Sequence, residues 1–460
     1  ELAKRAVPDE PEVYEREGRA RLHQNLRDAA LASFQQALVL RPQNPALKEM
    51  LRTLRGEDGS TSTPEAYALS SLLQEKLPTS TEDAVTLAEV THVRVQPSGL
   101  SSRFQQLVVK VQTQRGVEAY RAMPITWSPD RQEVRVLKAR ITKPDGSVVD
   151  SFGDEERNIN EPWTGMYYDA RARVLSFPTL SAGDVLEVQW RTDDTAIDNL
   201  LSDYWGDVDA LQGLTTKRHY RYVVEMPKSR PLSWNKETLP KWVTASSTTD
   251  GDRSTYRFEA TDVARVVPEP NMAGWAEISS PLHLSTYQNW EQVGRYYWGL
   301  VRDQLVPNEE LKRAVDTALK GIDRKDTDKV VAALYGFVVT NTRYVALEFG
   351  IHGYKPYRVD RVLARRFGDC KDKASLIHAM LKVAGVDSRL VLLRMRHLGT
   401  LAPEVASLAA FNHAIVYVPK LDLFLDGTAE FHGSRELPSA DRIANVLIVD
   451  DLIATGGTAE

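Results

Sequence analysis

The chain has 460 residues, enough for about three domains, and its 42% hydrophobic and 26% charged residues are ordinary for a globular protein. A formal net charge of −5 and a pI near 6.1 exclude the basic footprint of a nucleic-acid-binding protein. The single cysteine excludes an internal disulfide framework, and no apolar run of the sequence approaches the ~20 residues that cross a membrane.

The first segment has the pattern of one tetratricopeptide-type repeat. Small, aromatic and proline residues fall at the spacing of such a repeat at Tyr14, Gly18, Ala30, Phe34, Ala37 and Pro42. This spacing predicts helices over 12–24 and 27–40. Because one repeat cannot bury its hydrophobic face alone, residues 1–55 are expected to be the end of an array. An ordinary helical hairpin is the alternative. Residues 56–81 predict a linker and a short helix.

Between residues 82 and 270 the hydrophobic pattern changes to period two, which indicates strands. The predicted strands lie over 86–96, 102–113, 134–142, 174–177, 184–192, 217–225 and 254–261. They predict an all-β, sandwich-like domain. Aromatic residues gather in the loops 160–169 and 193–207, and we expect them to pack against a neighbouring domain rather than to bind a ligand.

Beyond residue 271 apolar residues recur at three- and four-residue steps, which indicates helices. The predicted helices lie near 290–300, 311–319 and 330–339, and a strand is expected over 445–449. Residues 271–450 are therefore predicted to form a separate domain. Residues 451–460 are expected to begin a further segment, and both ends of the sequence are expected to be cuts in a longer product.

The only cysteine, Cys370, stands at the predicted start of a helix of about four turns that ends at Gly385. Asp369 is the natural N-cap, which puts Cys370 in the first turn. There, free backbone N–H groups and the positive end of the helix dipole stabilise an anion. A cysteine that only packs in the core is the alternative, but the charged neighbours Asp369 and Lys371 argue against it. The pattern favours a thiolate nucleophile.

Residues 413–426 predict a β-hairpin that carries a base for this thiol. A two-residue loop would pair His413 directly with Asp426. Because Pro419 cannot adopt the positive φ of a tight primed turn, we expect a four-residue loop, which pairs His413 with Thr428. In both registers His413 and Asp426 share one face, and in the second they are diagonal neighbours roughly 7 to 8 Å apart at the backbone.

Cys370, His413 and Asp426 thus form a candidate set of nucleophile, base and orienter. Taken singly, His413 could be a structural histidine at a strand end, and Asp426 could be a turn former. The other histidines near them in the sequence have no metal-ligand spacing; they are His352, His378, His397 and His432. No phosphate loop or dinucleotide fingerprint appears, so neither a cofactor nor a metal is predicted.

The order of these pieces resembles the bacterial branch of the transglutaminase-like cysteine enzymes over about residues 286–450. The matching pieces are Gly350 to Pro356, Gly368 to Lys373, Asn412-His413 and Leu425 to Thr428. The resemblance implies an α+β papain-like fold and assigns the triad to Cys370, His413 and Asp426. The sequence departs from the family at Lys355, where glutamine is usual, and at Gly427, where proline is usual. The first departure questions any oxyanion role of that loop, and the second is expected only to loosen a turn.

Residues 82–270 resemble the uncharacterised bacterial β-domain that recurrently precedes a transglutaminase-like domain. The matching features are a Pro-Asp-Gly turn, an aromatic acidic loop, and a strand that begins with Gly-Asp-Val-Leu-Glu at 183–187. The whole chain is therefore expected to be a multidomain protein with a helical repeat fragment, a β-sandwich-like domain and a papain-like α+β domain.

The function predicted from the sequence is thiol-dependent acyl transfer on a protein or peptide amide, by hydrolysis or by transamidation. A protease, an amidase and a crosslinking transglutaminase are all compatible with this chemistry. The resemblance implies an exported or envelope-associated, periplasmic protein, with a protein partner bound through the repeat. The alternative is a non-catalytic assembly protein in which the repeat and the β-domain bind partners.

Overall fold

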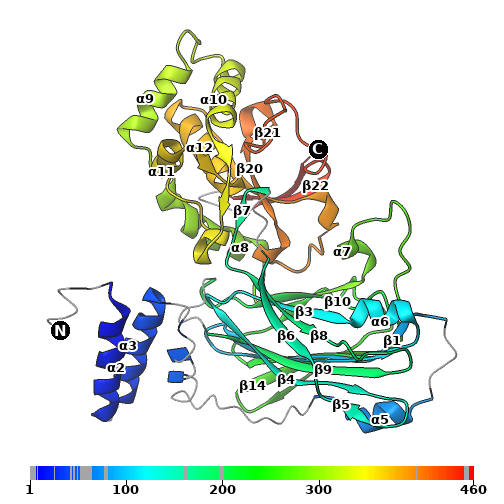
Figure 1. Ribbon diagram of the computed structural model, residues 1–460. Helices are drawn as coiled ribbons and strands as arrows, with labels where there is room; N and C mark the ends of the chain where they lie inside the picture. The colour runs from blue at the N-terminus through cyan, green and yellow to red at the C-terminus, as the bar shows by residue number, and fades with distance from the viewer. Residues whose placement is uncertain are drawn as a thin grey trace.

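The computed structural model describes residues 7, 9–24, 26–41, 44, 47–48, 50–51, 65–76, 81–159, 164–195, 201–399, 401–449 and 455–459. Figure 1 shows a pair of N-terminal helices beside a large β-rich region, and a mixed α and β region that sits above it. The predicted multidomain organisation, with a β-rich region followed by an α+β region, is confirmed.

The N-terminal helices are α2 (Pro11–His23) and α3 (Arg27–Leu40), close to the predicted ranges. Gly18 allows them to pack closely, because a Cβ at this position would come within 2.6 Å of the Phe34 ring. A helix pair of this kind fits a single repeat and an ordinary hairpin equally well. The Lys48 ammonium donates to the carbonyl of Pro129 at 2.7 Å and so connects this segment to the β-rich region.

The β-rich region is built on an eight-stranded sheet in the order β13-β14-β11-β1-β2-β9-β4-β5. Its strands are β1 (Ala84–Val95), β2 (Ser101–Val111), β4 (Gln132–Thr142), β5 (Val148–Val149), β9 (Val185–Asp194), β11 (Lys217–Pro227), β13 (Thr244–Asp250) and β14 (Arg253–Val263). Neighbouring strands are antiparallel except β1 and β11, which run parallel. The short helices α5 (Leu69–Gln74) and α6 (Gln114–Tyr120) pack against this region through Leu72 and Val117.

Two three-stranded sheets complete the β-rich region and bury its cores. One contains β3 (Ala122–Trp127), β8 (Arg171–Ser176) and β6 (Gly153–Asn158), and the other contains β10 (Gly206–Ala210), β15 (Pro281–Ser285) and β12 (Ser233–Trp234). Leu175 of the first packs on the large sheet with Ile141 and Val188, and Leu284 of the second packs with Tyr222 and Val224. Because β15 lies beyond residue 270, we define the β-domain as residues 84–285.

The C-terminal domain, residues 290–459, begins with helices and ends with a five-stranded sheet in the order β21-β20-β19-β22-β23. Its helices are α8 (Trp290–Val301), α9 (Glu309–Ala318), α10 (Thr327–Asn341), α11 (Val359–Arg365) and α12 (Cys370–Val383). Its strands are β16 (Arg343–Tyr344), β17 (Ala346–Leu347), β18 (Phe367–Gly368), β19 (Arg389–Arg394), β20 (His413–Val418), β21 (Leu423–Leu425), β22 (Ala444–Val449) and β23 (Thr455–Ala459). Residues 286–289 connect the two domains, and α7 (Trp275–Ile278) precedes β15 within the β-domain.

The helix α12 lies at the centre of the C-terminal domain. Its side chains Leu376, Ile377, Met380 and Leu381 are fully buried in one hydrophobic cluster with α8–α11 and β20. Burial of a leucine or isoleucine side chain contributes about 1.5–3 kcal/mol, so these contacts fix the helix firmly. Gly385 ends it with φ at +78°, as the sequence predicts.

The two domains are joined by a pair of short parallel strands. In Figure 1, β7 (Met166–Tyr167) reaches up from the β-domain into the C-terminal domain, where it pairs with β17. Part of the aromatic loop 160–169 therefore packs against the neighbouring domain, as predicted; Trp163 lies outside the described residues. Among the described residues, no helix is both long enough and apolar enough to span a membrane.

Candidate active site

The start of α12 holds Cys370 in a defined position. The Asp369 carboxylate accepts a hydrogen bond from the N–H of Asp372 at 3.1 Å, and the Asp372 carboxylate accepts one from the N–H of Asp369 at 3.4 Å. This reciprocal capping box fixes the first turn. Cys370 is half-buried and is the first helical residue, in the turn where N–H groups lack helical partners. The predicted N-cap and first-turn cysteine are confirmed.

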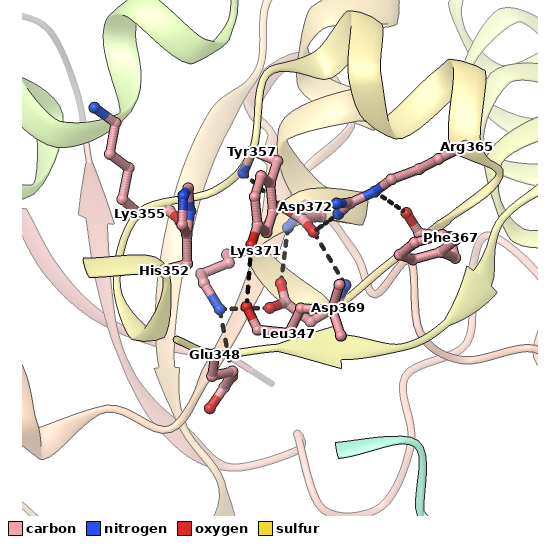
Figure 2. A network of polar contacts seen from close by, with 10 residues as sticks. All are labelled: Leu347, Glu348, His352, Lys355, Tyr357, Arg365, Phe367, Asp369, Lys371 and Asp372. Carbon is pink, nitrogen blue, oxygen red and sulfur yellow. Dashed lines mark hydrogen bonds and ion pairs between the residues drawn. The ribbon is translucent and has the colours of Figure 1, made fainter. Parts of the chain in front are cut away.

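Lys371, beside the cysteine, is a buried cation between two carboxylates (Figure 2). Its side chain is 6% exposed, and its Nζ lies 2.5 Å from Asp369 Oδ2 and 3.3 Å from Glu348 Oε1. Burial alone would lower the pKa of Lys371, but the charges of Asp369, Cys370 and Glu348 hold it well above its usual value. A permanent positive charge therefore stands next to the thiol.

Asp372 connects the capping box to the preceding loop (Figure 2). Its Oδ1 accepts the N–H of Tyr357 at 2.7 Å, and its Oδ2 accepts a hydrogen bond from the Arg365 guanidinium at 2.6 Å. Arg365 also lies over the rings of Tyr357 and Phe367, at 4.3 and 4.5 Å from their centroids. Burial and the charge of Asp369 raise the pKa of Asp372 to about 7, although Tyr357 and Arg365 act in the opposite sense. The helix start is thus tied to residues on both sides of it.

His413 is the first residue of β20 and lies in the hairpin that the sequence predicts. The pairs Val418↔Leu423 and Val416↔Leu425 leave a loop of four residues, 419–422. The predicted register is therefore confirmed. Asp426 directly follows β21, the strand that pairs with β20.

His413 and Asp426 form a buried pair. Nε2 of His413 lies 3.2 Å from Oδ1 of Asp426, and the two side chains are 9% and 3% exposed. The ring N–H is not aligned on that oxygen well enough for a hydrogen bond, so the contact is an ion pair at this distance. Thr428 holds the carboxylate in place, because its N–H and its hydroxyl each donate to Asp426 Oδ1 at 2.8 Å.

The electrostatics of the pair favour a charged ring. Burial alone would lower the pKa of His413, but its contacts with Asp426 and Cys370 and their negative charges raise it well above the usual value. Burial would likewise raise the pKa of Asp426, but His413 and Thr428 lower it. The arrangement therefore stabilises an imidazolium beside Cys370 and Asp426.

Cys370 and His413 open into one cleft of about 520 Å³. Its walls come from both domains. The C-terminal domain contributes Tyr297, Tyr344, Glu348, Gly350, Gly353, Tyr354, Lys371, Leu392, Leu408, Phe411, Asn412 and Ala414, and the β-domain contributes Ser128, Asp130, Arg131, Met166, Tyr168, Asp169 and Ala170. Asp426 is not among the lining residues, so it lies behind His413 as seen from the cleft. A bound molecule would reach the thiol and the imidazole from the same side.

Comparison with known families now places both domains. Residues 314–419 match the model of the transglutaminase-like superfamily. The C-terminal domain therefore contains a transglutaminase-like domain. Residues 97–267 match the model of DUF3857, a domain of unknown function with a solved structure.

Among solved structures, the fold is similar to that of a "putative protease" from Parabacteroides distasonis ATCC 8503. The TM-score is 0.63 and the identity is 15%, over 82% of this chain and 72% of that chain. A "putative cysteine protease" from Cytophaga hutchinsonii matches over 55% of this chain and 80% of that chain with 13% identity, but its TM-score of 0.24 carries no argument. A search of curated proteins gives no match. The first comparison shows a shared fold.

The two departures from the family motif have different consequences. Lys355 does not line the cleft, and in Figure 2 its side chain points away from Lys371 and Asp369. Gly427 does more than loosen a turn. A Cβ there would lie 2.9 Å from Ile377 Cδ1 and 3.1 Å from Lys373 Cβ, so the loop after Asp426 packs directly on α12.

Several residues of the site gave no signal in the sequence. Glu348, which neutralises Lys371, lies in a loop without a recognisable motif. The β-domain residues reach the cleft only through the pairing of β7 with β17, which joins segments about 180 positions apart. Asp441 is the third group, besides His413 and Asp426, in a set whose possible ligand atoms all lie within 4.8 Å of one another. Its position at a loop end before β22 could be predicted from the strand pattern, but its neighbours could not.

Proposed function

We propose that the protein is a thiol-dependent acyl-transfer enzyme that acts on an amide of a peptide or protein, with Cys370 as nucleophile, His413 as base and Asp426 as orienter. The observation that carries this proposal is the opening of Cys370 and His413 into one cleft, with the buried His413–Asp426 pair behind the imidazole. A histidine that only packed in the core would need neither a buried carboxylate nor a neighbouring thiol.

In the first step, the thiolate of Cys370 attacks the carbonyl carbon and a C–S bond forms. The developing oxyanion is stabilised by free N–H groups at the start of α12. The C–N bond then breaks as His413 gives its proton to the leaving amine, which yields an acyl-enzyme. His413, again neutral, takes a proton from water or from an amine that attacks the thioester, and the C–S bond breaks to restore the thiolate.

Asp426 supports both steps by orienting the ring and stabilising its charged form. Lys371 adds a fixed positive charge at the nucleophile, and Asp369 and Glu348 keep this cation in place. A peptide is the proposed substrate class because the cleft is an open groove between two domains and the fold is shared with a protein described as a "putative protease".

The test is the rate at which iodoacetamide alkylates the only cysteine at pH 7, followed by mass spectrometry. A free thiol, with a pKa near 8.5, is only about 3% ionised at pH 7. If His413 keeps Cys370 as a thiolate, we expect wild type to react at least about tenfold faster than the His413→Ala variant. His397→Ala is the matched control, since His397 is exposed and does not line the cleft.

The same variants separate the proposal from a non-catalytic assembly protein. Equal alkylation rates in wild type and His413→Ala would show a thiol without an activating base, and the enzyme proposal would fail. Under the proposal, Cys370→Ala, His413→Ala and the double variant lose similar amounts of acyl transfer on a peptide amide, because residues that act as a unit are not additive.

A further inference from the structure

Asp441 is a buried carboxyl group at the back of the site. It belongs to the loop that leads into β22 and is 0% exposed. The loop backbone is fixed: the N–H of Asp441 donates to Pro438 at 3.0 Å, and Ala440 accepts the N–H of Arg396 at 2.8 Å. Neither carboxyl oxygen of Asp441 accepts a hydrogen bond from an N–H or O–H of the described residues. A buried polar group without a partner is costly, so its surroundings need an explanation.

The groups that face Asp441 are His413, at the start of β20, and Asp426, after β21. A ring nitrogen of His413 and one carboxylate oxygen of each aspartate all lie within 4.8 Å of one another. The cations on the neighbouring elements α12 and β19 and in the loop of Asp441 itself have other partners. The ammonium of Lys373 in α12 donates to the Thr342 carbonyl at 2.7 Å, and Arg442 donates to Leu437 in its own loop. Arg394 at the end of β19 donates to the carbonyls of Leu398, Gly399 and Ala410.

Two carboxyl groups at this distance in a buried site ionise together only at a cost, which raises the pKa of one of them. A carboxylic acid, unlike a carboxylate, can donate a hydrogen bond to a neighbouring carboxylate. With one proton between Asp441 and Asp426, the buried set of His413, Asp426 and Asp441 has no net charge, because the imidazolium balances the remaining carboxylate.

We propose that Asp441 is a positioning residue which shares a proton with Asp426 and thereby controls how strongly Asp426 stabilises the charged ring of His413. This inference rests on the proposed thiol chemistry, since it concerns the same imidazole. Burial raises the pKa of Asp441 to about 6; the charge of His413 acts in the opposite sense, and the charge of Asp426 adds to the increase. The shared proton is thus lost within the working range of a thiol enzyme.

The direction in which Asp441 shifts the pKa of His413 follows because two titrating groups must affect each other equally. Because the imidazolium of His413 lowers the pKa of Asp441, ionised Asp441 must raise the pKa of His413 by the same coupling. Below about pH 6 the proton of Asp441 weakens the support that Asp426 gives to the ring. Above it, a second carboxylate stabilises the imidazolium and, through it, the thiolate of Cys370.

The test is the pH dependence of Cys370 alkylation from pH 4.5 to 8.5 in wild type and in Asp441→Asn. The asparagine amide keeps the shape and can donate to Asp426, but it cannot ionise. Below pH 5 we expect equal alkylation rates in wild type and Asp441→Asn. Above pH 7 we expect wild type to react about tenfold faster, which corresponds to a pKa of His413 that is one unit higher in wild type. In the infrared difference spectrum, one carboxylic-acid C=O band should disappear near pH 6 in wild type and be missing from the variant, while the band of Asp372, whose pKa is about 7, remains in both proteins.

A ratio of rates that does not change with pH would overturn the proposal. If the variant does not fold, the wild-type curve alone decides, because a single titration step without an inflection near pH 6 excludes Asp441. A stoichiometric zinc ion that copurifies with Cys370→Ala and is lost in Cys370→Ala/Asp441→Asn would also overturn it, since the three groups would then hold a cation. Failure of thiol activation itself appears separately, as equal alkylation in His413→Ala.

Discussion

Replacement of Lys371 by methionine tests whether the buried ion pair holds the start of α12. Methionine keeps most of the side-chain length but removes the charge. Asp369, 1% exposed, would lose its cation and keep only its bond to the N–H of Asp372. Loss of one partner from a buried pair costs about 3–5 kcal/mol, so we expect Lys371→Met to reduce the stability of this domain by about 3 kcal/mol. Glu348 is 28% exposed and stays solvated, so its loss of Lys371 adds little.

Double-mutant cycles separate the two carboxylates. Asp369→Asn retains a good N-cap while it removes the charge, and Glu348→Gln is the matched change at the more exposed partner. We expect a coupling of about 2–3 kcal/mol between Lys371→Met and Asp369→Asn, and less than about 1 kcal/mol between Lys371→Met and Glu348→Gln. Native-state hydrogen exchange, measured on peptides from α12, confines the measurement to this domain.

The result that would refute this reasoning is equal coupling at the two carboxylates, or a stronger coupling to Glu348. The burial of each carboxylate would then not determine the strength of its interaction with Lys371.

Two further predictions concern the loop after Asp426 and the place of the protein in the cell. Gly427→Ala brings a Cβ within 2.9 Å of Ile377 Cδ1, so we expect a loss of about 1–3 kcal/mol in stability and slower alkylation of Cys370. Gly433→Ala is the control: because it has open space around it, it should behave as wild type in both measurements. We also propose an envelope location with a partner bound through residues 1–55. Fractionation of the cells should therefore find the protein outside the cytosol, and a cytosolic protein whose partners survive deletion of the repeat would contradict this.

The local features of the site could be predicted from the sequence because each has a local physical cause. Asp369 and Gly385 mark the ends of α12 by their capping and left-handed preferences. Pro419 disfavours a tight two-residue turn, and this favoured the four-residue loop that the structure shows, with His413 and Asp426 on one face. These arguments need no knowledge of the rest of the fold.

The features that could not be predicted depend on contacts between distant segments. Asp441 belongs to the site only because β22 pairs with β19, which brings its loop behind His413. The strands β6 and β13 are polar and largely exposed, so they lack the alternating pattern by which strands are recognised. Lys371 could be seen as a charged neighbour of Cys370, but not as a cation buried between Asp369 and Glu348.

Because the β-domain forms one wall of the cleft, the proposed function gives it a direct part in the selection of the substrate. Gly165, with φ at +75°, lets the loop before β7 approach the Tyr344 carbonyl, which a Cβ there would meet at 3.1 Å. Met166 and Tyr168 consequently face the same cleft as Cys370. Under the proposed acyl transfer, a substrate fits between two domains before it reaches the thiol, and the choice of acyl acceptor depends on how far this wall excludes water. Differences among proteins with this pair of domains should thus concentrate in residues 164–170 rather than around Cys370 and His413.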